Sequence, residues 1–106
     1  MTIDDFKKFE FKVAEIKEVR EHPNADRLYV LKVSLGDSER QVVAGIRAAY
    51  PNKEDLVGRR VVVVANLDPA VIRGEESQGM VLAASDENGP SVLSPDRAVA
   101  LGSVVK

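Results

Sequence analysis

The chain has 106 residues, of which 44% are hydrophobic and 30% charged, a composition that fits one folded domain over residues 1–106 and excludes a disordered chain. Its formal net charge of −2 excludes a positive electrostatic potential over the whole surface, so any nucleic-acid binding must depend on a local cluster of basic side chains. It has no cysteine and one histidine, which excludes disulfides, Cys–His catalysis and thiolate or His-rich metal sites. We expect no metal, no cofactor and no membrane span, and a cytoplasmic location, which the lack of cysteine suits.

The first half of the chain predicts a helical lead followed by three strands. "TIDDFKKFEF" (residues 2–11) spaces its apolar residues along one side of a short helix. "FKVAEIKEVREH" (11–22) predicts a long strand whose apolar positions change parity near the middle, which indicates a β-bulge. "LYVLKVSLG" (28–36) alternates strictly and "RQVVAGI" (40–46) returns, so Leu28 to Ile46 is predicted to be a hairpin.

The second half predicts further short strands around one helical insert. "RAAYPNKEDLVGRR" (47–60) suits a short helix ended by Gly58, and "RVVVVANL" (60–67) a strand buried on both faces. "DPAVIRGEES" (68–77) reads as a loop, "QGMVLAAS" (78–85) as a strand, and two β fragments follow it. The predicted fold class is all-β: an OB-fold five-stranded barrel with a short helix between strands 3 and 4 and small terminal additions.

Catalytic motifs are missing, and "HPNAD" (22–26) has a structural explanation. No nucleophile elbow, phosphate-cradling glycine loop or dinucleotide fingerprint occurs, so we expect no enzyme. The residue before a proline is extended, and Asn24 and Asp26 can bond nearby backbone, so this stretch predicts a turn. A functional alternative is that the turn directs Arg27 toward a partner.

"RGEESQGMVLAA" (73–84) is the second unusual stretch. Gly79 inside a predicted strand indicates a bulge or a closely approaching backbone. Met80 is either a core filler or an exposed apolar contact, and Ser77 and Gln78 can hydrogen-bond a ligand or the loop itself.

Basic residues sit on the predicted strands or at their ends. Lys32 and Arg40 fall on strands 2 and 3, whose outer face binds nucleic acid in barrels of this type. Stacking aromatics are scarce, and Tyr29 shares its parity with core positions. Any binding would therefore depend on phosphate contacts, hydrogen bonds and shape.

"HPNADRLYVLKV", "RQVVAGI", "LVGRRVVVVANL" and "IRGEESQGMVLAAS" occur in an order that resembles the tRNA-binding domain family. This family includes the C-terminal domain of many methionyl-tRNA synthetases and free-standing structure-specific tRNA-binding proteins. The resemblance covers nearly the whole chain and implies non-catalytic, largely sequence-independent binding of tRNA by a homodimer. As a synthetase domain, the chain would also associate with the catalytic part of methionyl-tRNA synthetase. The RNA-binding residues expected from the resemblance and from strand geometry are Arg27, Lys32, Arg40, Asn66, Arg73, Ser77, Gln78 and Met80.

Departures from the family pattern keep other readings open. Asp68 and Val71 stand where members commonly have basic residues, and Lys12 where arginine is more usual. Fewer bases mean fewer phosphate contacts. The alternatives are a dimeric secretion-type chaperone that binds unfolded peptides on the same barrel, and a purely structural dimerisation module. The acidic balance favours the chaperone, whereas the intact "HPNAD" and "ESQGM" blocks disfavour it. The sequence leaves open whether the chain is a free protein or an excised domain.

Overall fold

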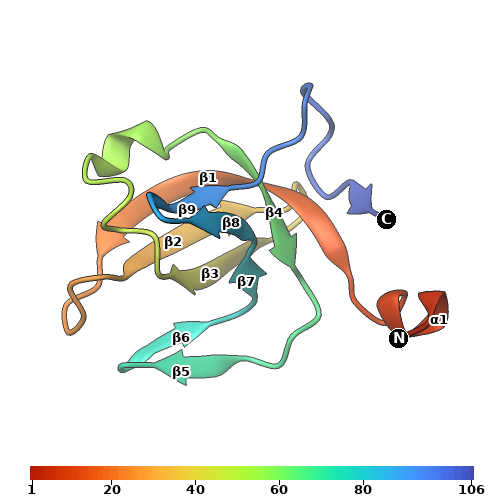
Figure 1. The fold of residues 1–106 in the computed structure, drawn as a ribbon, viewed down its shortest axis with the longest axis horizontal. Coiled ribbons are helices and arrows are strands. Elements are labelled where there is room, and N and C mark those ends of the chain that lie inside the picture. Colours follow the sequence, from red (N-terminus) through yellow and green to blue (C-terminus); the bar gives the residue numbers. More distant parts are fainter.

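A curved antiparallel sheet with the strand order β3-β2-β1-β4-β7 forms a nearly closed barrel (Figure 1). The computed structural model describes all 106 residues. The helical insert between β3 and β4 is a single 3₁₀ turn, η1, at Lys53–Asp55. The predicted barrel and its insert are therefore confirmed, with strands β1 Phe11–Glu21, β2 Tyr29–Ser34, β3 Glu39–Ala44, β4 Arg60–Val64 and β7 Met80–Val81.

The bend of β1 lets one strand serve both halves of the barrel. Its first half, through Glu15, pairs with β4, and from Glu15 onward it pairs with β2. The register with β2 shifts between Ile16 and Glu18, which is the predicted bulge. Bulges increase local bending, and a barrel this small needs a bent strand to close.

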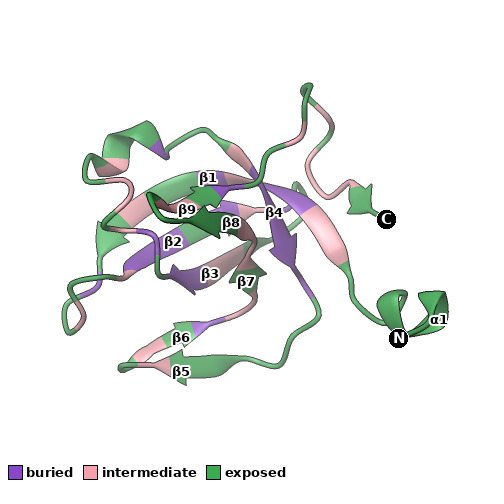
Figure 2. Cartoon of the chain, viewed as in Figure 1, coloured by how far each residue is buried: buried purple, intermediate pink, exposed green.

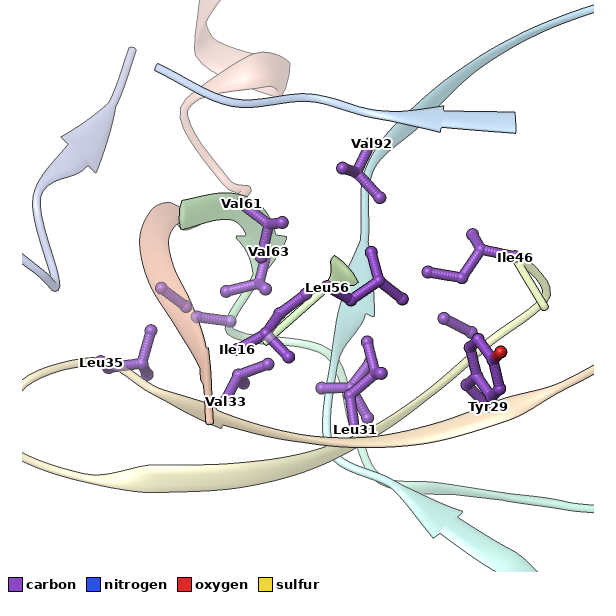
Figure 3. Close-up of a cluster of buried hydrophobic side chains, with 14 residues drawn as sticks. Ile16, Tyr29, Leu31, Val33, Leu35, Ile46, Leu56, Val61, Val63 and Val92 are labelled. Atoms are coloured by element: carbon purple, nitrogen blue, oxygen red, sulfur yellow. The ribbon is translucent and has the colours of Figure 1, made fainter. Parts of the chain in front are cut away.

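The barrel interior is filled by aliphatic side chains and one tyrosine (Figure 3). Tyr29, Leu31 and Val33 enter from alternate positions of β2 and are almost fully buried, as the alternation predicts. Leu56, directly after η1, is fully buried in the same cluster. All four valines of β4 are buried, which confirms a strand covered on both faces (Figure 2).

Two predicted segments are wrong in detail. Residues 68–77 are not a plain loop: β5 (Ala70–Ile72) and β6 (Glu75–Ser77) form a hairpin that projects from the barrel (Figure 1). Its two-residue turn has positive φ at both Arg73 (53°) and Gly74 (94°), and a tight hairpin turn favours this pattern. An arginine rarely adopts positive φ, so the sequence pattern did not predict a two-residue turn here. The strand predicted at 78–85 is divided into β7 and β8 (Ala83–Asp86), and β8 pairs with β9 (Gly89–Val92).

Both termini lie at the end of the barrel opposite the β1–β2 turn (Figure 1). Helix α1 (Ile3–Phe6) begins at Thr2, which forms a reciprocal capping box with Asp5. The last strand, β10 (Val104–Val105), pairs with the start of β1. None of the helices has the length and apolar character that crossing a bilayer requires.

Candidate nucleic-acid interface

His22 joins the two unusual stretches of the sequence. Its ring is buried, with 3% of its surface exposed, and Nε2 lies 2.9 Å from the carbonyl oxygen of Ile72 on β5. Nδ1 accepts a hydrogen bond from the backbone N–H of Asn24 at 3.0 Å. An imidazole nitrogen that accepts carries no proton, so Nε2 is the donor to Ile72 and the ring is neutral. The lone histidine is therefore a structural connector between the β1–β2 turn and the β5–β6 hairpin.

Two further contacts hold the hairpin against the same turn. Arg20 on β1 forms an ion pair with Glu75 on β6. Arg73, at the hairpin tip, donates from Nη2 to the carbonyl oxygen of Asn24 at 3.1 Å. Because this turn and this hairpin are the loops that flank the ligand face in OB barrels, their contacts fix the shape of that region.

Ser77 and Gln78 close the barrel between β3 and the end of β6. The Ser77 hydroxyl accepts from Val43 N–H at 3.0 Å and donates to the Gly79 carbonyl at 2.9 Å. The Gln78 side chain accepts from Gln41 N–H at 2.9 Å, and Gln78 N–H donates to the Gln41 carbonyl at 2.7 Å. These side chains replace a missing backbone ladder, since β3 and β7 are not paired directly.

Arg40 and Asn66 are also engaged with backbone. Arg40 Nη1 donates to the Ala65 carbonyl and sits 3.5 Å from the Gln78 carbonyl. The Asn66 amide accepts from Glu10 N–H at 2.9 Å and donates to the Lys8 carbonyl at 2.7 Å. Asn66 therefore links the N-terminal segment to the end of β4 by hydrogen bonds.

Three arginines from three different loops gather at the β1–β2 turn. Arg27 and Arg73 line one surface depression with Asn24 and Asp26. Arg47, after β3, donates its backbone N–H to the Arg27 carbonyl at 3.3 Å, and its guanidinium lies 5.9 Å from the Tyr29 ring centroid. None of the three forms an ion pair with an acidic side chain. We call Arg27, Arg47 and Arg73 the arginine cluster. The sequence-based site omitted Arg47, whose position next to Arg27 depends on the β2–β3 pairing.

Two lysines outside the arginine cluster are paired with acidic side chains. Lys53 Nζ lies 3.2 Å from Glu21, and Lys32 Nζ lies 3.4 Å from Glu18. The hydrogen bond from Lys53 holds the pKa of Glu21 below its ordinary value, and the Arg47 charge adds to this effect. Glu21 is therefore ionised at neutral pH and offsets part of the local positive charge. Lys32 sits in a different groove from the arginine cluster, on the outer face of β1–β3 with Arg20 and Arg40.

Met80, the first residue of β7, is 48% exposed, so it is not a core filler. The close approach predicted at Gly79 is real: a Cβ there would lie 2.8 Å from the Val64 carbonyl oxygen. Gly79 also has φ +144°, so only glycine fits without strain. The fixed backbone at Gly79 directs Met80 outward, at the edge of an apolar groove between β3 and the hairpin.

A family profile described as "Putative tRNA binding domain" matches residues 11–104. The chain belongs to this tRNA-binding domain family. As a family member, it is 50% identical over 106 residues to a methionine–tRNA ligase from Thermococcus kodakarensis. That match covers 100% of the chain and 14% of the ligase, so the chain spans about a seventh of such relatives.

Two solved structures share the whole barrel of this tRNA-binding domain. A MetRS-related protein from Pyrococcus horikoshii has a TM-score of 0.90 and 34% identity, and the match covers 100% of this chain and 97% of that one. A CsaA chaperone protein from Picrophilus torridus has a TM-score of 0.92 and 30% identity, with 100% and 99% covered. Similar domains therefore exist both inside long ligases and as chains of about this length.

Proposed function

We propose that this domain binds tRNA without catalysis, through phosphate contacts centred on the arginine cluster, and largely independently of RNA sequence. Family membership supports tRNA as the partner. The relationship to methionine–tRNA ligases supports an accessory role beside a synthetase's catalytic part, and a cytoplasmic location stays a prediction. The observation that carries the proposal is that Arg27 and Arg73 share one depression and that the Arg47 backbone is hydrogen-bonded to Arg27. None of the three has an acidic partner, on a protein whose net charge is −2.

The chemistry of the arginine cluster suits the RNA backbone. A guanidinium offers a fork of donors that matches phosphate, and it remains charged at any relevant pH. Phosphate contacts position a nucleic acid but carry no sequence information. The three arginines come from loops that His22 and the hairpin contacts hold together, so the positions are preorganised before RNA arrives.

A filter-binding titration of unmodified tRNA at several salt concentrations tests this proposal. We expect salt-sensitive binding, with a log–log slope that becomes shallower by about 0.7 to 0.9 for each cluster arginine changed to alanine. Arg27→Glu should weaken binding further because it adds a repulsive charge. Arg97→Glu is the matched control, since Arg97 is exposed on the segment between β9 and β10. Equal effects of Arg27→Glu and Arg97→Glu, or no tRNA binding at low salt, would refute the proposal.

We also propose that the domain pairs with a second copy through an apolar patch at its termini. The patch combines α1 with β10 beside Phe11, and its exposed apolar side chains are Ile3, Phe6, Phe9, Val104 and Val105. An exposed cluster of this kind on a small domain marks an interaction surface. Sedimentation should give about twice the 11.5 kDa chain mass, and Val104→Asp should return the protein to a monomer. A monomer at every accessible concentration would contradict the pairing.

Peptide binding is the second candidate function. It is favoured by the likeness to the CsaA chaperone protein and by the apolar groove beside Met80. An unfolded peptide that binds tightly and is not displaced by tRNA would support it over the RNA function.

A further inference from the structure

The apolar groove beside Met80 has no part in the phosphate contacts proposed above. Its volume is about 530 Å³, within the range of small-ligand sites. Its walls come from the end of β3, the β5–β6 hairpin and β7, and most of the lining residues are hydrophobic. The apolar lining includes Leu67, Ala70, Ile72, Met80 and Pro90.

Gly45 presents free hydrogen-bonding groups at the edge of this groove. Neither its backbone N–H nor its carbonyl forms a hydrogen bond in the structure, and the residue is exposed. Earlier on the β3 edge, Gln41 is bonded to Gln78 and Val43 N–H to Ser77. The Gly45 donor and acceptor therefore follow the occupied part of this edge and lie beside the apolar walls of the groove.

This arrangement fits a flat ring better than an extended chain. A peptide that adds a strand to a sheet edge needs a row of free backbone groups, and Ser77 and Gln78 block that row on β3. A nucleobase needs one donor–acceptor pair for its edge and apolar surface for its faces. The exposed aromatic side chains Phe6 and Phe9 lie in the terminal patch, so beside the β5–β6 hairpin this groove is the apolar surface on which an unstacked base can shed water.

Asp68 supplies the one acidic side chain among the groove residues. A carboxylate there repels phosphate, but it accepts hydrogen bonds from the exocyclic amino group of a base such as cytosine. Uracil presents a carbonyl oxygen at the corresponding position, which the carboxylate would repel. The acidic residue therefore changes what this part of the surface can bind, from backbone to base.

We infer that the groove holds one unstacked, amino-bearing base of a bound RNA and that Asp68 disfavours uracil. The inference rests on the proposed function and adds a limited base preference to binding that is otherwise sequence-independent. The phosphates flanking that nucleobase lie outside the groove, where basic side chains such as Arg73 remain accessible.

Fluorescence anisotropy with labelled oligoribonucleotides of about eight nucleotides tests the inference at the length one barrel accommodates. The wild-type domain should bind oligo-C about tenfold more tightly than oligo-U, the size of one good polar discrimination. Asp68→Asn should bring the two affinities to within about twofold, because an amide also donates to the uracil carbonyl. Asp96→Asn removes the same charge from an exposed site between β9 and β10, and should raise both affinities without changing their ratio.

The outcomes separate this inference from the proposed function. If tRNA binds but oligo-C and oligo-U bind equally, or the preference persists in Asp68→Asn, the base site is wrong and the arginine cluster stands. If neither tRNA nor either oligonucleotide binds at low salt, both proposals fail. Displacement of oligo-C by an unfolded apolar peptide, with no preference between the oligonucleotides, would assign the groove to peptides and overturn the inference.

Discussion

Replacing Ser77 by alanine distinguishes a barrel-closing role from a role in contacting RNA. The serine is 3% exposed, and its hydroxyl is bonded to both Val43 N–H and the Gly79 carbonyl. The methyl group of alanine leaves both partners without a bond. Val43 N–H is buried, so leaving it without a partner lowers the free energy of unfolding by about 1 to 3 kcal/mol. The partly buried Gly79 carbonyl adds roughly 0.5 to 1 kcal/mol.

The expected loss of about 1.5 to 4 kcal/mol is large for a domain of this size. Since 1 kcal/mol shifts Tm by about 4 to 8 °C in domains of up to roughly 100 residues, Tm should fall by roughly 6 to 32 °C. Thermal unfolding followed by circular dichroism measures the shift. Ser91→Ala is the matched control, because Ser91 is exposed on β9 and its hydroxyl forms no hydrogen bond within the chain. It should leave Tm within about 2 °C.

Binding measured well below the lowered Tm completes the test. If Ser77 serves only the barrel, the folded Ser77→Ala variant should bind tRNA within about twofold of wild type. Arg27→Ala should show the reverse pattern, with unchanged Tm and weaker binding, since the Arg27 side chain is exposed and forms no bond. A Ser77→Ala variant that keeps its Tm but loses tRNA would refute the barrel-closing role and restore the contact suggested by the family resemblance.

Two further predictions follow from the ion pair beside the arginine cluster and from the His22 connector. Glu21→Gln should raise tRNA affinity roughly two- to fivefold at low salt, because it frees Lys53 from a carboxylate that is ionised at neutral pH; an exposed pair is worth up to about 1 kcal/mol. Glu87→Gln, at an exposed turn, controls for net charge, and an equal gain there would contradict the local explanation. His22→Ala should cost about 2 to 4 kcal/mol of stability and accelerate hydrogen exchange at Asn24, because two hydrogen bonds and a buried ring are lost. Unchanged exchange at Asn24 would show that His22 does not order the β1–β2 turn.

Alternation and turn chemistry predict most of the barrel. The β2–β3 hairpin and the bulge at Ile16 follow from apolar parity, which depends only on residue order. The β5–β6 hairpin could not be predicted in the same way, because each strand has three residues and no alternating face. Its stability comes from residues distant in sequence, chiefly His22 and Arg20, and a local pattern contains no information about them.

The candidate site is only partly predictable for a related reason. Ser77 and Gln78 carry groups that suit a ligand, but a sequence does not show whether an open strand edge lies within their reach. In the structure that edge is β3, and it takes their hydrogen bonds. Arg27 and Arg73 were predicted separately and line one depression in the structure, whereas Arg47 joins them only through strand pairing. The RNA-binding role of each predicted residue stays a prediction.

The acidic balance of the chain constrains how it can bind RNA. A formal charge of −2 gives no long-range attraction to a polyanion, so association is not accelerated by steering at a distance. Affinity must then come from contacts within about one Debye length, which is about 8 to 10 Å at ordinary salt. Under these conditions the salt slope counts the phosphates that the arginine cluster touches, with little contribution from the rest of the surface. A measured slope of about −2 to −3 would therefore match three arginines, and a much steeper slope would require a second copy of the domain to contribute its own cluster.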